Sequence, residues 1–453
     1  MGNSTIMKKE EAAYIYLLLF HAFLGVLIFA MPFLSKLFTL TIFVFGIYYI
    51  IENKNKNNEA LVISAYVVSF EVLLRMTDGM LINEFGKYSI LIFMLLGMVY
   101  SGFSKNGILY WIFLLLLIPG IILASLTPEL NVDVKKIISF NISGPVCLGI
   151  SAIYCFQRKI SFNRVLGVIT AFCLPLMALA AYLYLYTPNV RDVITGTQSN
   201  FETSGGFGPN QVSTILGLGV FVFFVQFMFN SKSLLLQIVN AGLVVFFAFR
   251  GLVTFSRGGM ITAIMMIIIL LGVIYFRANG QIKSKIGLII LISFITGLGV
   301  WGYSSFQTSG LINKRYANQD AMGREKKDRL GGREEIMNQE LEIFIDNIIF
   351  GVGTGMGKYK RAEITGTEVA SHNEITRMLA EHGSLGLIDL LILFFTPLFL
   401  WVNNRQNILA LSFLVFWLLT INHAAMRLAA PAFVYALSLL KVYTHEKPAL
   451  HRE

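Results

Sequence analysis

Long apolar runs separated by short polar connections dominate the chain from residue 13 to residue 444. A helix needs about 20 mainly apolar residues to cross the hydrocarbon core of a membrane, and runs near that length recur along the whole sequence. We therefore predict an all-α polytopic membrane helical bundle of about twelve to fourteen transmembrane helices. The expected spans lie at about 13–33, 36–51, 60–77, 88–103, 108–126, 144–156, 164–187, 209–229, 234–253, 258–276, 285–303, 384–402, 407–422 and 428–444.

Composition and charge support a membrane protein and set its expected orientation. Hydrophobic residues make up 56% of the chain and charged residues only 14%, whereas soluble domains are about 25% charged. The net charge of +10 is spread over short connections, so it does not indicate nucleic-acid binding. Lys and Arg fall on alternate connections, which the positive-inside rule makes cytoplasmic. Both termini are then inside, and the three cysteines show no spacing for a disulfide or a zinc site.

One polar interval, residues 304–383, is much longer than the others and falls on the extracytoplasmic side of this topology. It divides the chain into an N-terminal transmembrane bundle (1–303), a large extracytoplasmic loop with amphipathic helices (304–383), and C-terminal transmembrane helices with a cytoplasmic tail (384–453). From Arg333 onward, apolar residues recur at three- and four-residue spacing. This spacing predicts an amphipathic helix that lies on the bilayer or caps a cavity.

His372 is the candidate general base in this loop. Ser371 and Glu374 have the spacing of a capping box, which places Ser371 at an N-cap and His372 in the first turn of a helix that runs to about Glu381. The partial positive charge at a helix N-terminus disfavours an imidazolium ion, so His372 is expected to stay neutral and able to accept a proton. The alternative is an ordinary exposed residue of a first turn.

Arg250 and Arg257 are candidate ligands for phosphate. They are seven positions apart near the outer end of a span, which would place them on roughly one helical face. Arginine suits phosphate because its rigid fork of donors matches phosphate oxygens. Gly258 and Gly259 would let a backbone or a ligand come close. Both arginines could instead anchor the helix at the membrane interface.

Other polar residues lie near the same outer ends. Arg75 follows Glu71 by four residues within a span, so the two are expected to pair inside the bundle, as a structural ion pair or as part of a ligand site. Asn210 opens the span that starts at Pro209 and could contact a sugar or cap the helix. His423 lies in an outer turn beside Arg427, where it is a candidate contact to acceptor or phosphate.

Several short motifs occur in a fixed order. They are Thr254-Phe-Ser-Arg257-Gly-Gly, Gly332-Arg333-Glu334, Phe350-Gly-Val-Gly353, Ser371-His372-Asn373-Glu374 and Ala380-Glu381-His382-Gly383-Ser-Leu-Gly386. In this order and spacing the chain resembles the O-antigen ligase and O-antigen polymerase superfamily over about residues 200 to 430. The resemblance implies a bundle of about twelve helices with a large periplasmic loop. It also implies a multi-pass protein of the inner (cytoplasmic) membrane with its active site on the extracytoplasmic face.

The resemblance further implies a reaction. Family members transfer a glycan from an undecaprenyl-pyrophosphate carrier to a glycolipid or glycan acceptor, without a metal ion or other cofactor. By resemblance Arg257 holds the pyrophosphate and His372 is the base. Arg250 or Arg75 would add positive charge there, while Arg333, Asn373, Asn210 and His423 are candidate contacts to substrate.

The residue chemistry agrees with this reaction, because pyrophosphate leaves as a stable anion once cations compensate its charge, and one base then suffices. No pair of carboxylates with glycosidase character is apparent in the loops. Three alternatives remain open at this point: a ligase, a polymerase that extends a lipid-linked chain, and a flippase or other transporter of lipid-linked glycan.

Overall fold

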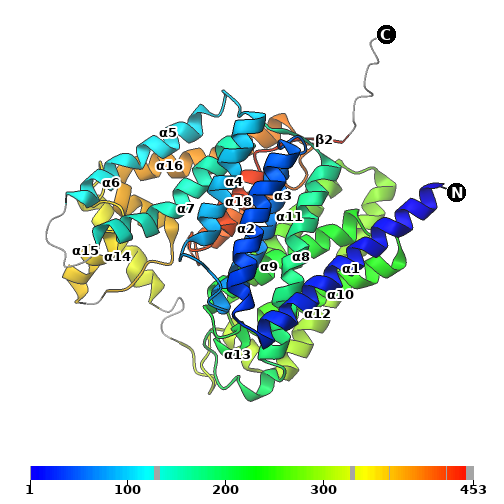
Figure 1. Ribbon diagram of the computed structural model, residues 1–453. Coiled ribbons are helices and arrows are strands. Elements are labelled where there is room, and N and C mark those ends of the chain that lie inside the picture. Colours follow the sequence, from blue (N-terminus) through cyan, green and yellow to red (C-terminus); the bar gives the residue numbers. More distant parts are fainter. Residues whose placement is uncertain (1, 127–132, 327–331, 367, 425, 445–453) are drawn as a thin grey trace, which may run out of the picture.

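The computed structural model describes residues 2–126, 133–326, 332–366, 368–424 and 426–444. The described chain is almost entirely helical, as the sequence predicts (Figure 1). Its elements are α1 (Gly2–Ala30), α2 (Leu34–Asn53), α3 (Glu59–Met76), α4 (Phe85–Ser101), α5 (Ile108–Leu116), α6 (Ile118–Ser125), α7 (Val134–Cys155), β1 (Lys159–Ser161), α8 (Phe162–Tyr186), η1 (Val190–Asp192), η2 (Glu202–Ser204), α9 (Pro209–Phe229), α10 (Leu234–Leu252), α11 (Arg257–Arg277), α12 (Gly280–Gln307), α13 (Leu311–Tyr316), α14 (Arg333–Asp346), α15 (Gly357–Thr365), α16 (Glu374–Asn403), α17 (Ala410–Ile421), α18 (Ala430–Leu437) and β2 (Lys441–Tyr443).

The apolar runs become membrane-crossing helices. Ten candidate spans in the described residues are long and apolar enough to cross a bilayer, and α4 and α17 are shorter apolar helices. The run at 108–126 is divided into α5 and α6, with Pro119 at the start of α6. The last run is also broken: α18 ends at Leu437, and β2 then pairs in parallel with β1. The prediction of a polytopic all-α membrane protein is therefore confirmed.

The helix α9 lies at the centre of the bundle and contacts α8, α10 and α11. It is 83% buried over its most apolar window, whereas α12 is only 11% buried and lies on the outside. Glycine allows the central helices to approach closely: a Cβ atom on Gly259 of α11 would lie 2.0 Å from the carbonyl oxygen of Ser213 in α9. The start of α11 is thus fixed against the most buried helix.

The connections that carry the sequence motifs meet on one side of the bundle, which we call the loop face. Hydrogen bonds join them across long sequence distances. The amide of Asn200 donates to the carbonyl of Thr254 (2.9 Å), and Nε of Arg315 donates to the carbonyl of Phe255 (2.9 Å). The helices α13, α14 and α15 lie on this side, while β2 lies at the opposite end of the bundle (Figure 1).

Candidate active site

Arg257 is the first residue of α11 and is placed by a tight turn. The preceding helix α10 ends at Leu252, and Phe255 takes a left-handed conformation (φ 57°) within the turn. Ser256 is the N-cap residue, and its hydroxyl donates to Oδ1 of Asn210 at 2.8 Å. The Arg257 and Asn210 segments, predicted separately as site elements, are therefore neighbours at the loop face.

Arg250 does not contribute to the same site as Arg257. The same turn separates the two arginines onto different helices, so the prediction that they share a helical face is wrong. The guanidinium of Arg250 is buried and donates to the carbonyls of Leu183 (2.9 Å), Thr187 (3.3 Å) and Thr203 (3.3 Å). These carbonyls lie at the end of α8 and in the loop that follows. Arg250 therefore fastens that loop to the bundle.

Three half-buried arginines, Arg257, Arg315 and Arg333, form what we call the basic cluster. Burial, and then the positive charges of Arg257 and Arg333, lower the pKa of the Arg315 guanidinium. Burial, and then the positive charge of Arg257, likewise lower the pKa of Arg333. Like charges held this close favour a bound anion, because an anion removes their mutual repulsion.

His423 lies against the start of α11. A Cβ atom on Gly258 would lie 2.4 Å from the imidazole ring of His423, so only glycine permits this contact. Nε2 of the ring is 3.1 Å from Oγ1 of Thr214, and Nδ1 is 2.8 Å from the carbonyl oxygen of Leu419. Burial lowers the pKa of His423 to about 4; the contact with Leu419 opposes this, and Arg333 adds to it. Both ring nitrogens are therefore already engaged.

The helix after His372 begins later than the capping box predicts. Asn373, rather than Ser371, is the N-cap of α16, and its Oδ1 accepts from the amide of Ile375 at 2.9 Å. Ser371 instead accepts from the amide of Asn373 at 3.2 Å. The predicted box fails because Glu374 takes a buried partner, Arg377, in place of the cap.

His372 therefore lies in the loop just before α16 instead of in its first turn. Gly383 (φ 60°, ψ −140°) breaks α16, so its first segment ends close to Glu381 as predicted. Burial, followed by the positive charges of Arg427 and Arg333, lowers the pKa of His372 to about 4, while a contact with the Ala370 backbone opposes the shift. The imidazole is thus neutral at neutral pH. Desolvation and the nearby arginines keep His372 neutral, whereas the sequence predicted that the positive end of a helix would do so.

Arg427 and Arg75 connect the His372 loop to α3. Nη2 of Arg427 donates to the carbonyl of Ser371 at 3.1 Å. Arg75 pairs with Glu71 at 3.0 Å, which confirms the predicted ion pair, and it donates to the carbonyl of Arg427 at 3.4 Å. The other oxygen of Glu71 accepts from the amide of Ala429 at 2.8 Å. Arg75 thus supports the segment that carries Arg427.

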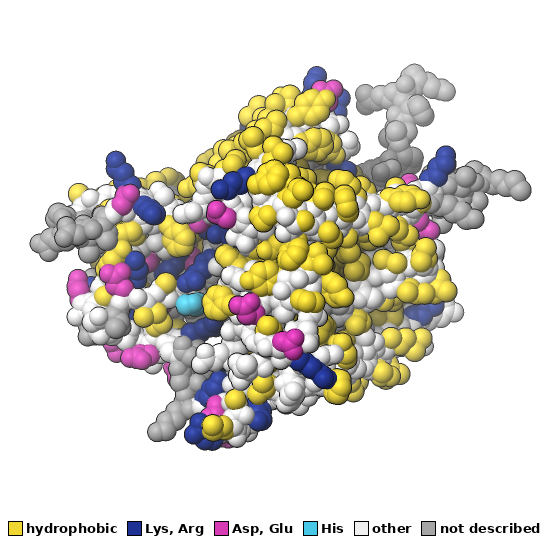
Figure 2. Space-filling model, turned by 60° about the horizontal axis from the view of Figure 1, so that its bottom comes forward, with side chains coloured by type: hydrophobic (Ala, Val, Ile, Leu, Met, Phe, Trp, Pro, Cys, Tyr) yellow, Lys and Arg dark blue, Asp and Glu magenta, His cyan; other side chains and the backbone are white. Residues whose placement is uncertain are grey.

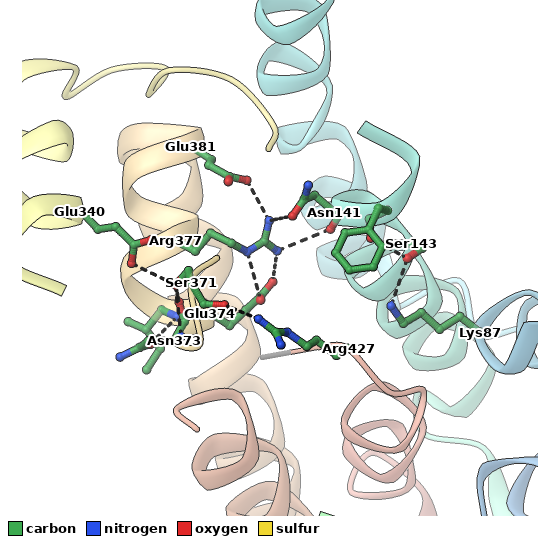
Figure 3. Close-up of polar contacts among 12 residues, drawn as sticks. Lys87, Asn141, Ser143, Glu340, Ser371, Asn373, Glu374, Arg377, Glu381 and Arg427 are labelled. Carbon is green, nitrogen blue, oxygen red and sulfur yellow. Dashed lines mark hydrogen bonds and ion pairs between the residues drawn. The ribbon is translucent and has the colours of Figure 1, made fainter. Parts of the chain in front are cut away.

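A cavity of about 450 Å³ lies beside this segment, between the start of α4, α7 and the helices α14 to α16. We call it the charged cavity. Its lining includes seven buried charged residues, Glu84, Lys87, Glu340, Arg361, Glu374, Arg377 and Glu381. Ala370, Ser371 and Arg427 also line it, so it adjoins His372. Figure 3 shows Arg377 between Glu374 and Glu381, with Arg427 and Lys87 entering from other elements.

The charged cavity is not predicted by the sequence pattern. Glu374, Arg377 and Glu381 lie three and four residues apart on one helix, a spacing that could have signalled an ion-pair group. Their partner across the cavity, Asn141, comes from α7, and its Oδ1 accepts from Arg377 at 3.2 Å. No local pattern links these two segments.

Figure 2 shows Lys and Arg side chains gathered around a histidine side chain on one face of the molecule. Together the fold and the site define a multi-pass helical membrane protein with a cationic site at one end of its helical bundle. The sequence model of the O-antigen ligase family matches residues 242–391, about a third of the chain. Over these residues the chain is similar to the O-antigen ligase family, which confirms the resemblance found in the sequence motifs.

The matched segment contains the basic cluster, His372 and the α16 side of the charged cavity. His423 and the α4 and α7 sides of that cavity lie outside it. A search of curated proteins finds no match to the chain.

Proposed function

We propose that the protein is a glycosyltransferase that moves a glycan from an undecaprenyl-pyrophosphate carrier to an acceptor sugar. One observation carries the proposal: the charge of Arg257 acts on Arg333 within the basic cluster, and the charge of Arg333 acts on the neutral His372. An anion-binding group and a proton acceptor are thereby neighbours within the segment that matches the O-antigen ligase family.

In the proposed reaction, the basic cluster binds the pyrophosphate, and Arg257 contributes its forked donors. The acceptor hydroxyl attacks the anomeric carbon, the bond from that carbon to the pyrophosphate oxygen breaks, and its electron pair leaves with the lipid pyrophosphate. His372 takes the hydroxyl proton. Positive charge near the leaving group stabilises the developing anion, so no carboxylic acid is required.

The remaining predicted residues take supporting roles. Asn210 and His423 flank the start of α11, where both position Arg257 and Asn210 also contacts substrate. Arg333 is the member of the basic cluster whose charge also acts on His372. Asn373 caps α16 and so orients the His372 loop. Arg75 acts through Arg427, and Arg250 holds the loop beneath the cluster.

The proposal places the loop face outside the cytoplasm, with both termini inside. Single cysteines at Lys326 and Lys105 test this, because the three native cysteines are buried. An impermeant thiol reagent applied to intact cells should label position 326 and leave position 105 unlabelled. The opposite labelling would overturn the orientation.

Transfer by the purified protein tests the function. A lipid-linked glycan donor is offered either a delipidated glycan acceptor or a second molecule of lipid-linked glycan. Transfer to the first acceptor defines a ligase, and extension of the second defines a polymerase. Movement of lipid-linked glycan across a proteoliposome membrane, with no new glycosidic bond, would refute the transferase and favour a transporter.

A further inference from the structure

The charged cavity concentrates ionisable side chains that the basic cluster and His372 do not use. Lys87 pairs with Glu84 at 2.6 Å, Arg361 pairs with Glu340, and Arg377 pairs with Glu381 at 2.8 Å. Taking such groups out of water costs several kcal/mol for each ion, which pairing only partly offsets. So many buried charges around one open space indicate a binding site more than a stabilising core.

One polar atom in the cavity wall has no partner. Glu84 is only 6% exposed, and its Oε1 atom makes no hydrogen bond with any described residue. A buried carboxylate oxygen normally accepts at least one hydrogen bond. A hydroxyl group of a ligand in the cavity would supply the missing donor.

The remainder of the lining suits a sugar. Tyr88 and Phe140 line the cavity and are 37% and 48% exposed, so their rings offer apolar faces to the C–H groups of a pyranose. Carboxylates and the amide of Asn141 offer hydrogen bonds to hydroxyl groups around the ring. Aromatic faces beside convergent carboxylate and amide groups match the alternating apolar and polar surfaces of a carbohydrate.

The position of the cavity relative to His372 decides which sugar it holds. Ala370 and Ser371, which precede His372, line the cavity, and Arg427 in its wall donates to the carbonyl of Ser371 at 3.1 Å. The three arginines of the basic cluster are not part of that lining. A base must contact the attacking hydroxyl on the side opposite the departing pyrophosphate. The cavity adjoins the His372 segment and is separate from the basic cluster, so it can hold the molecule that carries this hydroxyl.

We propose that the charged cavity binds the acceptor, with its receiving sugar between Glu84 and the rings of Tyr88 and Phe140 and its reactive hydroxyl directed toward His372. This inference rests on the proposed transferase function. The walls contributed by α4 and α7 lie outside the segment that matches the ligase family. They can therefore determine which acceptor this protein uses.

Phe140→Ala and Tyr88→Ala test the site, because both side chains are partly exposed and their loss should leave the fold intact. The probe is the delipidated glycan released from the source cell envelope by mild acid. Its binding to the purified protein is measured at equilibrium, and its KM is measured in the transfer assay. Binding of undecaprenyl pyrophosphate is measured in parallel. Each variant should weaken glycan binding about tenfold, as expected for loss of an aromatic contact, and leave carrier binding unchanged.

Phe201→Ala is the matched control, since this aromatic residue is 59% exposed and does not line the cavity. Glu84→Gln removes the charge, keeps the shape, and should also weaken glycan binding. Unchanged glycan binding in all three cavity variants would overturn the proposal. So would weaker binding of the carrier-linked donor glycan alone, which would assign the cavity to the donor. A third outcome separates the two proposals. If the variants lose glycan binding but the wild-type protein performs no transfer, the cavity is a sugar site and the transferase function is refuted.

Discussion

The basic cluster and the charged cavity are both close to His372 and differ in how their charges are compensated. In the cluster, Arg257 and Arg333 lower the pKa of Arg315 by repulsion. In the cavity, buried cations are matched to carboxylates, as Arg377 is matched to Glu374 and Glu381. Both regions contain half-buried or buried arginine, and in the cavity the described side chains include the carboxylates that pair with it.

This difference indicates what each region is suited to bind. Repelling cations gain stability from an external anion, so the cluster fits a pyrophosphate. Paired charges have less need of an ion and instead present fixed hydrogen-bond donors and acceptors, so the cavity fits a neutral, hydroxyl-rich molecule. A base close to both regions can accept a proton from one substrate while the pyrophosphate of the other leaves.

The largest expected effect is at His372, which joins the two regions. His372→Ala should reduce transfer by about 10²–10⁴-fold, the usual contribution of a general base, while undecaprenyl pyrophosphate still binds. His382→Ala is the control: His382 is buried against Gly120, so this change should lower protein level more than turnover. Near-normal turnover of purified His372→Ala, with turnover lost in His382→Ala or His423→Ala, would assign the base to another residue.

Breaking the charge matching of the cavity should destabilise the protein. Arg377→Ala leaves Glu374 and Glu381 buried without their cation, a change that costs about 3–5 kcal/mol in buried pairs. We expect a lower Tm for the detergent-solubilised variant. Arg324→Ala removes an exposed pair with Asp320 and should leave the Tm unchanged. Equal Tm values for both variants would show that the cavity charges are not coupled.

Changing the geometry of the basic cluster should lower transfer from the lipid-linked donor. Arg257→Ala should lower transfer about 100-fold, as loss of one charge-stabilising donor does. Arg257→Lys keeps the charge but loses the forked geometry. Its transfer activity should therefore be well below that of the wild type, although the protein inserts normally into the membrane. Arg324→Lys, at an exposed arginine between α13 and α14, is the matched control. Full activity in both Arg257 variants would make this residue an interface anchor.

The smallest expected effect is a shift in pH dependence. The pKa of His372 is about 4, so kcat/KM should stay constant as pH falls until it approaches that value, where protonation removes the base. Arg427→Gln removes one positive charge that lowers this pKa, so the acidic limb should move toward higher pH. Lys358→Gln, a change at a cavity cation that does not act on His372, should leave the limb in place. An unmoved limb in Arg427→Gln would separate Arg427 from the base.

The sequence by itself determined the class of the protein and many of its elements. Apolar runs of membrane length can be satisfied only as helices, because lipid offers no hydrogen bonds to the backbone. Local signals likewise identified the Glu71–Arg75 pair, the start of α9 at Pro209, and the end of the first segment of α16 near Glu381. Each of these depends on neighbours within a few residues.

Competition between local signals was harder to resolve. Ser371 and Asn373 are both good N-cap residues, and the choice of Asn373 depended on the buried partner of Glu374. Arg250 and Arg257 have helical spacing, but the turn at Phe255 separates them and gives Arg250 the carbonyls of another helix. Distant groups decided both outcomes, so the sequence pattern alone could not.

Only the tertiary structure brought the walls of the charged cavity together. Lys87, Asn141 and Glu340 lie on separate helices, and each has an ordinary local setting in the sequence. They become the walls of one cavity because α4, α7 and α14 pack around the start of α16. Helical periodicity specifies which face of each helix is buried, but the partner of that face depends on the packing of the whole bundle.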